Sequence, residues 1–125
     1  MIYLASSSGL SRAFLLEVTE ELSSLDTVFC PILAWRWNGS EKGALLIQEV
    51  NHFSLERATS LVAVVGSEVA IGVWGEIAVS RMRIPVCLLE TEVRTKNSVT
   101  SAGIPCFSSL EEVKRWLKGV TKEKK

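Results

Sequence analysis

The sequence predicts an α/β fold of three layers, in which helices cover both faces of a doubly wound parallel sheet of five strands. Two observations lead to this prediction. Short apolar segments alternate with amphipathic ones along the whole chain, which is the order of strands and helices in such folds. Ser60 to Val65 is a Val-rich apolar run, and a strand without polar alternation is typical of a parallel sheet that is buried on both faces.

Five segments have the character of strands. Each is a short apolar run near polar or turn-forming residues; they are Ile2 to Ala5, Thr27 to Ala34, Ser60 to Val65, Ile84 to Leu89 and Ile104 to Phe107. Pro85 falls near the start of the fourth segment, where a missing N–H is tolerated.

Four segments predict helices from the spacing of their apolar residues. The first begins after Ser11 as its N-cap, and the last begins with a capping box of Ser109 and Glu112. The second ends near Ala58 and the third near Met82. The apolar positions that we expect to face the sheet are Phe14, Val18 and Leu22, then Leu46, Val50 and Phe53, then Val73, Ile77 and Ala78, and finally Leu110, Val113 and Leu117. This alternation predicts a flavodoxin-like or Rossmann-like sheet.

The composition describes one domain with a substantial core. The 125 residues are 47% apolar and 22% charged, with 14 Lys and Arg against 14 Asp and Glu. We expect residues 1–120 to form the α/β domain and residues 121–125 a charged tail. Zero net charge weighs against a nucleic-acid polymer as partner, because binding to its phosphates needs a surplus of Lys and Arg. No apolar run approaches the ~18 residues of a membrane span, and no signal-peptide pattern follows Met1, so we expect a soluble cytoplasmic protein.

Cysteine and histidine are too few and too scattered for a metal site or a disulfide framework. Cys30, Cys87 and Cys106 lie far apart, and His52 is the single histidine of the sequence. We expect Cys30 and Cys87, which lie in apolar runs, to be small core residues. The glycine-rich motifs of dinucleotide and P-loop sites and the serine-hydrolase motif do not occur in the sequence either.

The loop between residues 66 and 75 carries the clearest chemical signal. Ligands of doubly wound sheets bind at the carboxyl ends of the strands, which also directs attention to residues 6–10 and 35–43. Gly72 and Gly75 flank the start of a helix that carries Glu76. Glycine lets a ligand approach the backbone closely, and a helix N-terminus favours an ionised carboxylate, which suits a nucleophile. The alternative is a solvated Glu that complements the helix dipole.

Four motifs occur in order along the chain. They are Ile2-Tyr3-Leu4 with the small-residue loop 6–9, Ile47-Gln48-Glu49-Val50-Asn51, Gly72-Val73-Trp74-Gly75-Glu76 and Arg83-Ile84-Pro85-Val86. In order and spacing they resemble the nucleoside 2-deoxyribosyltransferase family, particularly its branch that hydrolyses deoxynucleoside 5′-monophosphates. The resemblance implies assembly as a homodimer or larger homo-oligomer, a nucleoside or nucleotide as the small-molecule partner, and no cofactor.

The resemblance gives three residues a place in catalysis. Glu76 matches the nucleophile that attacks the anomeric carbon of the deoxyribose. Tyr3 matches a residue that holds this Glu or the sugar, although it fits an ordinary strand aromatic as well. Asn51 stands where the family has a catalytic Asp, and an amide can hydrogen-bond but cannot pass a proton. His52 is then the fallback acid, unless it is simply an exposed helix residue.

A small-residue loop and one arginine are candidates for binding a 5′-phosphate. Backbone N–H groups and hydroxyls at the start of a helix suit an anion, and the residues are Ser6, Ser7, Ser8 and Gly9. Arg12 either adds a charge to this site or pairs with a Glu of its own helix.

The other substrate contacts fall on three loops. Trp35 and Trp37 either stack on the nucleobase or continue the second strand with one face buried. Ala70 stands where the family has an Asp or Ser that contacts the sugar, and Ser67 replaces it only if the loop folds differently. We expect Gly72, at the start of its helix, to let the substrate approach the backbone closely. Ser98 falls where the hydrolase branch has a serine contributed across the dimer.

Taken together, these residues predict cleavage or transfer of the N-glycosidic bond of a nucleoside or its 5′-monophosphate, with Glu76 as the nucleophile. Because Asn51 and Ala70 depart from the family's pattern, a catalytically weak nucleotide-binding module is one alternative. An NAD-cleaving glycohydrolase is another, since related α/β folds also use a Glu at this place.

Overall fold

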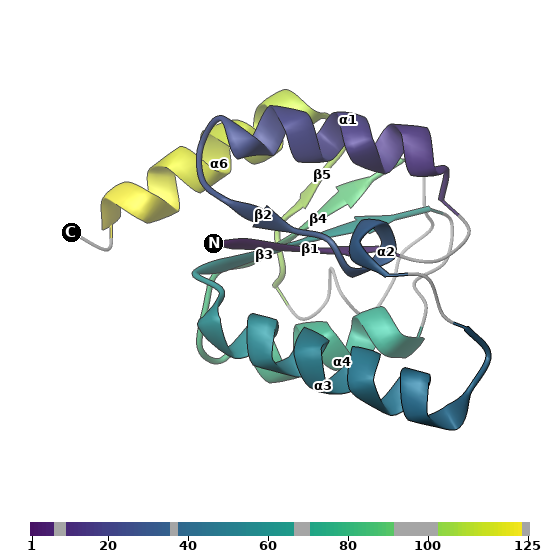
Figure 1. Ribbon diagram of the computed structural model, residues 1–125. Helices are drawn as coiled ribbons and strands as arrows, with labels where there is room; N and C mark the ends of the chain where they lie inside the picture. Colours follow the sequence, from purple (N-terminus) through teal and green to yellow (C-terminus); the bar gives the residue numbers. More distant parts are fainter. Residues whose placement is uncertain (7–9, 36–37, 67–70, 92–102, 124–125) are drawn as a thin grey trace.

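The computed structural model describes residues 1–6, 10–35, 38–66, 71–91 and 103–123, and its centre is a parallel sheet (Figure 1). The five strands run in the order β2-β1-β3-β4-β5. Their bounds are β1 (Ile2–Ser6), β2 (Val28–Phe29), β3 (Ser60–Val65), β4 (Val86–Glu90) and β5 (Cys106–Phe107). All four pairings are parallel, and the order reverses between β1 and β3, as in flavodoxin-like folds. The predicted fold class is therefore confirmed.

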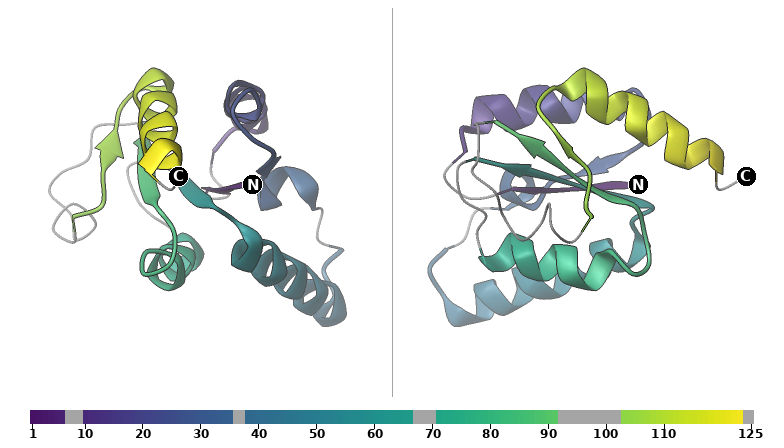
Figure 2. Two further views of the ribbon diagram at one scale, coloured as in Figure 1. Left: turned by 90° about the vertical axis from the view of Figure 1, so that its left-hand side faces the viewer. Right: turned by 180° about the vertical axis from the view of Figure 1, so that it is seen from behind.

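Helices form the two outer layers (Figures 1 and 2). One face of the sheet is covered by α1 (Arg12–Ser23) and α6 (Leu110–Glu123), and the other by α3 (Glu41–Arg57) and α4 (Ile71–Ser80). A single-turn helix, α2 (Pro31–Ala34), follows β2 at the edge of the sheet. Because α3 and α4 both return from the carboxyl edge of the sheet, they run side by side in the same direction.

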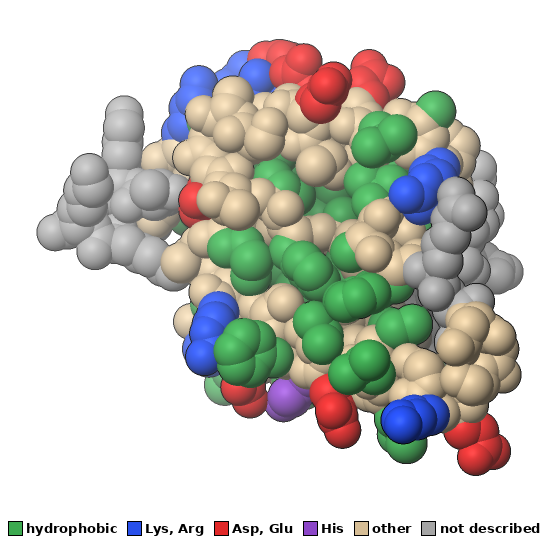
Figure 3. Space-filling model, viewed as in Figure 1, with side chains coloured by type: hydrophobic (Ala, Val, Ile, Leu, Met, Phe, Trp, Pro, Cys, Tyr) green, Lys and Arg blue, Asp and Glu red, His purple; other side chains and the backbone are tan. Residues whose placement is uncertain are grey.

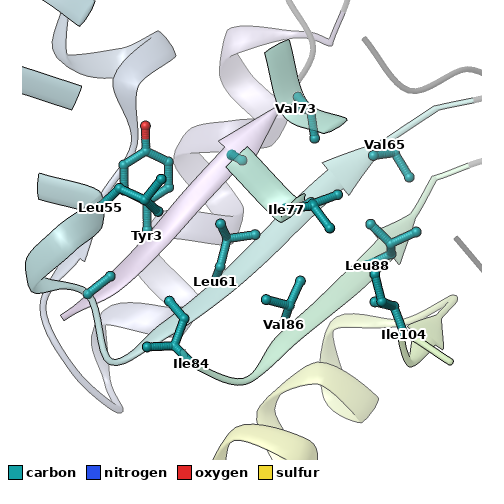
Figure 4. Packing of buried hydrophobic residues seen from close by; sticks show 13 residues of the cluster. Tyr3, Leu55, Leu61, Val65, Val73, Ile77, Ile84, Val86, Leu88 and Ile104 are labelled. Carbon is teal, nitrogen blue, oxygen red and sulfur yellow. The ribbon is translucent and has the colours of Figure 1, made fainter. Parts of the chain in front are cut away.

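The side chains of the strands alternate between two buried clusters. In β1, Tyr3 and Ala5 face the α3 and α4 layer, whereas Ile2 and Leu4 face α1 and α6. Figure 4 shows the first cluster, in which Tyr3 lies beside Leu55 of α3. All six residues of β3 are buried, as its uniformly apolar sequence predicted.

The predicted helix caps at Ser11 and Ser109 are confirmed. The Phe14 N–H donates to Ser11 Oγ over 3.0 Å, and the Glu112 N–H donates to Ser109 Oγ over 3.3 Å. In α1 the buried stripe contains Leu15 in place of the predicted Phe14, together with the predicted Val18 and Leu22. In α6 the predicted Val113 and Leu117 are buried.

The predicted second strand from Thr27 to Ala34 is wrong beyond Phe29. The chain leaves the sheet at Cys30 and forms α2, whose first residue is Pro31. Proline fixes its own φ near the helical value and lacks an N–H to donate to a neighbouring strand, so it suits the first position of a helix. Trp35 therefore ends a helical turn and does not continue the strand.

The predicted inner face of the second helix is also wrong. α3 begins at Glu41 because Ser40 caps it, accepting from the Gly43 N–H over 3.0 Å. Leu46 and Phe53, which we expected to face the sheet, are 58% and 54% exposed, and Leu55 is the buried residue of α3. Four-residue spacing identifies a helix, but it cannot decide which flank faces the sheet when a second flank is also apolar.

Candidate active site

Tyr3 and Glu76, far apart in the sequence, meet on the α3 and α4 side of the sheet. Tyr3 is the second residue of β1 and its side chain is fully buried. Glu76 lies in α4 on the inner side of the helix, one position before the buried Ile77. The Tyr3 hydroxyl donates a hydrogen bond to Glu76 Oε2. The structure thus brings together the two residues that the sequence proposed as nucleophile and partner.

Burial sets the acid–base character of this pair. Desolvation raises the pKa of the Glu76 carboxyl above its usual range, and the hydrogen bond from Tyr3 partly opposes this rise. The pKa of the Tyr3 phenol is raised strongly by burial and by the neighbouring Glu76, so Tyr3 keeps its proton. The pKa of Glu76 therefore moves in the direction opposite to the one expected for a carboxylate at a helix N-terminus, because burial dominates. Glu76 is the sixth residue of α4, beyond the first turn where the helix dipole acts.

A cavity of about 250 Å³ opens beside the pair. It lies between α3 and α4 over β1, and it is lined by Tyr3, Gln48, Asn51, His52, Leu55, Gly72, Gly75, Glu76 and Val79. Five of these nine residues are in the predicted site or its fallback: Tyr3, Asn51, His52, Gly72 and Glu76. The cavity therefore unites the first three sequence motifs that define the resemblance.

Asn51 is held by Trp35. The Trp35 indole Nε1 donates to Asn51 Oδ1 over 2.9 Å, and both side chains are partly buried. An indole N–H can only donate, so this contact identifies the amide oxygen of Asn51 and leaves its NH₂ group for other partners. Trp35, for which the sequence left base stacking and a continued strand as alternatives, here orients a residue of the cavity wall.

His52 lies at the exposed rim of the cavity. Its side chain is 68% exposed, and its Nε2 lies 3.1 Å from Glu56 Oε1 one helical turn further on. This arrangement agrees with the simpler expectation of an exposed helix residue. His52 thus differs from the half-buried Glu76 in having a neighbouring carboxylate and free access to water.

Two predicted phosphate contacts lie away from this cavity. Ser6 ends β1, and its buried Oγ has no hydrogen-bond partner within the described part of the chain. Arg12 donates to the carbonyl oxygens of Ile32 and Leu33 over 3.0 and 3.1 Å. It ties α1 to α2, so the expected pairing with a Glu of its own helix is wrong.

The remaining predicted contacts lie outside the described residues. They are Ser7, Ser8, Gly9, Trp37, Ser67, Ala70 and Ser98. The sequence reasoning missed Gln48, Leu55 and Val79 as lining residues. Helical spacing was the available signal, because Gln48 and Leu55 lie three before and four after Asn51, and Val79 lies three after Glu76.

The described residues offer no site for a metal ion. Among them, no group of three or more His, Cys, Asp or Glu side chains is placed to hold one. Over the same residues, we find no helix with the length and apolar character that a membrane crossing needs.

Comparison with known proteins gives one kind of match. Neither the family models nor the curated proteins match this sequence. Among solved structures, the chain is similar to a 2-deoxyribosyltransferase from the psychrotolerant bacterium Bacillus psychrosaccharolyticus. The identity is 22%, the match covers 90% of this chain and 88% of that chain, and the TM-score is 0.71. This likeness shows a shared fold over almost the whole of both chains.

Proposed function

We propose that the protein belongs with the nucleoside 2-deoxyribosyltransferases and cleaves or transfers the N-glycosidic bond of a nucleoside or its 5′-monophosphate. The observation that carries this proposal is the buried Tyr3–Glu76 pair at the wall of a cavity. A carboxylate that is partly removed from water and held by a single donor is a suitable nucleophile for an anomeric carbon. The shared fold with a 2-deoxyribosyltransferase supports the same reading.

In the proposed mechanism Glu76 acts as the nucleophile and Tyr3 holds it in place. Tyr3 occupies Oε2, so Oε1 attacks the anomeric carbon while the base departs. Water or a second base then displaces the carboxylate from the same carbon, which splits one difficult displacement into two easier ones. Two successive displacements retain the anomeric configuration.

Glycines at the cavity wall support close approach of the sugar. Gly72 and Gly75 line the cavity, and a Cβ added at either position would meet no atom within 4 Å. There is therefore space beside both glycines, and we propose that the substrate occupies it. The buried hydroxyl of Ser6 has no hydrogen-bond partner within the described residues and lies outside the cavity lining, at the carboxyl end of β1. We propose that a 5′-phosphate reaches Ser6 from a sugar bound in the cavity.

We also propose that two copies of the chain associate through the α3 side. The face shown in Figure 3 carries hydrophobic side chains in several places over its surface. Leu46 and Phe53 of α3 are more than half exposed, and Val79, which lines the cavity, is 60% exposed. Covering this surface removes apolar area from water and encloses the cavity. Light scattering tests it: Leu46→Glu with Phe53→Glu should reduce the mass to a monomer, whereas Leu16→Glu on α1 should not.

The decisive experiment is to incubate the protein with nucleosides and their monophosphates and to separate the products by chromatography. We expect free base from at least one substrate, and loss of release in Glu76→Gln. Glu20→Gln is the matched control, because Glu20 is an exposed Glu on the opposite helical layer. Mass spectrometry of the quenched reaction should find the sugar on the peptide that contains Glu76. Equal release by Glu76→Ala would contradict the assignment.

One outcome would favour the alternative of a binding module. Asn51 is an amide that cannot donate a proton to a leaving base, and this observation is what keeps the alternative open. A module without catalysis should show a melting temperature that rises with nucleotide concentration while no base is released. The same samples serve both measurements.

A further inference from the structure

Asn51 offers hydrogen-bond donors to the cavity, but it has no proton that it could transfer to a ligand. Its Oδ1 accepts from the Trp35 indole over 2.9 Å, and the described part of the chain gives its two amide hydrogens no acceptor. An amide is neutral at every accessible pH. Asn51 can therefore bind an acceptor atom of a ligand, but it cannot protonate one.

Among the described residues, the other polar groups that line the cavity either have a partner of their own or cannot donate an acidic proton. The Tyr3 hydroxyl already donates to Glu76, and Gln48 is another amide. His52 lies at the rim with its Nε2 against Glu56. None of the nine lining residues is Lys or Arg, so Glu76 is a half-buried carboxylate without a cation beside it in the cavity wall.

This arrangement suits one kind of leaving group. A neutral nucleobase departs as an anion unless an acid protonates it, and general acid catalysis typically contributes about 10²- to 10⁴-fold in rate. A base that already carries a positive charge departs as a neutral molecule and needs no acid. A cation is also attracted to a carboxylate that has no other counter-charge.

We propose that the cavity acts on nucleosides whose base carries a positive charge in the ring that is bonded to the sugar. Examples are an N-glycosyl pyridinium and an N7-alkylated purine. This proposal rests on the proposed function, because it keeps Glu76 as the nucleophile. Oε1 forms a bond to the anomeric carbon as the C–N bond breaks, and the bonding pair moves to the base and cancels its charge. Water then adds its oxygen to the same carbon, the carboxylate leaves, and one proton passes to the solvent.

The first test compares substrates whose bases differ in charge. The pair is deoxyguanosine and its N7-methylated form, with nicotinamide riboside as the pyridinium substrate. We expect kcat/KM for at least one charged substrate to exceed that for deoxyguanosine by about 100-fold or more, the contribution of an absent acid. A smaller ratio, with release of neutral bases, overturns this inference and leaves the proposed function standing. No release from any substrate by the folded protein overturns both.

The second test restores an acid at the same position. In Asn51→Asp one carboxylate oxygen can still accept from Trp35, and the other is free to carry a proton. We expect the ratio of charged to neutral substrate to fall at least about 10-fold, chiefly through faster release of neutral bases. Glu20→Gln, which changes a carboxyl outside the cavity, should keep the wild-type ratio. An unchanged ratio in a folded Asn51→Asp protein would contradict the role given to Asn51.

Discussion

The two faces of the sheet are covered by helices that pack in different ways. On one face, the 12-residue α1 buries Leu15, Val18 and Leu22. On the other face, the longer α3 has 17 residues and buries only Leu55. The number of buried residues in a helix therefore does not follow its length. Gln48 and Asn51 of α3 line the cavity, whereas the residues that α1 turns toward the sheet are aliphatic.

This contrast relates stability to function in one small domain. Each face of the sheet carries an apolar cluster and borders a cavity, and the α3 and α4 face places the half-buried Glu76 carboxyl in the wall of its cavity. A buried charge and an open cavity both reduce stability, and natural sites accept that loss where chemistry needs it. We therefore expect substitutions on the two faces to separate folding from activity.

The largest effect on stability should come from the α1 face. Leu22→Ala removes a fully buried side chain and should lower the free energy of unfolding by about 2–5 kcal/mol. Leu55→Ala should lie at the lower end of that range, because the cavity already borders Leu55. Denaturant titration measures both, and Leu16→Ala, at a site 51% exposed on α1, is the control for helix propensity. A greater loss for Leu55→Ala would contradict the comparison of the faces.

Removing the phenol should affect activity on the α4 face. In Tyr3→Phe the hydrogen bond to Glu76 is lost, and since this bond lowers the pKa of Glu76, that pKa should rise further. The acid limb of the pH profile of kcat/KM should move to higher pH, with a loss of about 10- to 100-fold at neutral pH. An acid limb that stays in place would show that another group controls it.

The stability of the α4 face should depend on pH through Glu76. Burial raises the pKa of Glu76 in the folded state, so its favourable contribution is complete below the unfolded pKa and is lost as pH rises through the folded pKa. Glu76→Gln should therefore be more stable than the wild type at neutral pH, and the difference should shrink in acid. Thermal unfolding of both proteins across pH measures it. A difference that grows in acid would mean that the pKa is lowered.

The smallest expected effect distinguishes two glycines. Gly72→Ala and Gly119→Ala each add a Cβ that meets no atom within 4 Å, in α4 and α6 respectively. Each should stabilise its helix by up to about 1 kcal/mol. Gly72→Ala should also weaken substrate binding, since Gly72 lines the cavity and Gly119 does not. Unfolding curves and KM values for the two variants separate these effects, and equal KM values would argue against close approach at Gly72.

The sequence predicted the parts of this fold that depend on local patterns. The uniform apolar run of β3, the caps at Ser11 and Ser109 and the five-stranded parallel sheet follow from composition and spacing. It failed for β2, where Pro31 outweighed the apolar run, and for α3, where two apolar flanks compete for the sheet. Which flank wins depends on contacts between distant segments.

Part of the lining of the candidate site was predictable from the sequence, but its geometry was not. The motifs around Tyr3, Asn51 and Glu76 line one cavity. Their surroundings were not foreseen, because burial of Glu76 and the contact from Trp35 to Asn51 arise only when strands and helices pack. The direction of the Glu76 pKa shift is the clearest example, since local helix electrostatics predicted the opposite sign.

Arg83 connects α3 and α4 at one end of the space between them. It follows α4 and donates to the carbonyl oxygens of Leu55 and Ala58, where α3 ends. These hydrogen bonds thus connect the two helices at the amino edge of the sheet. Any widening of the space between them must occur mainly at their starts, near the carboxyl edge. We therefore expect the proposed substrate to enter and leave at that edge.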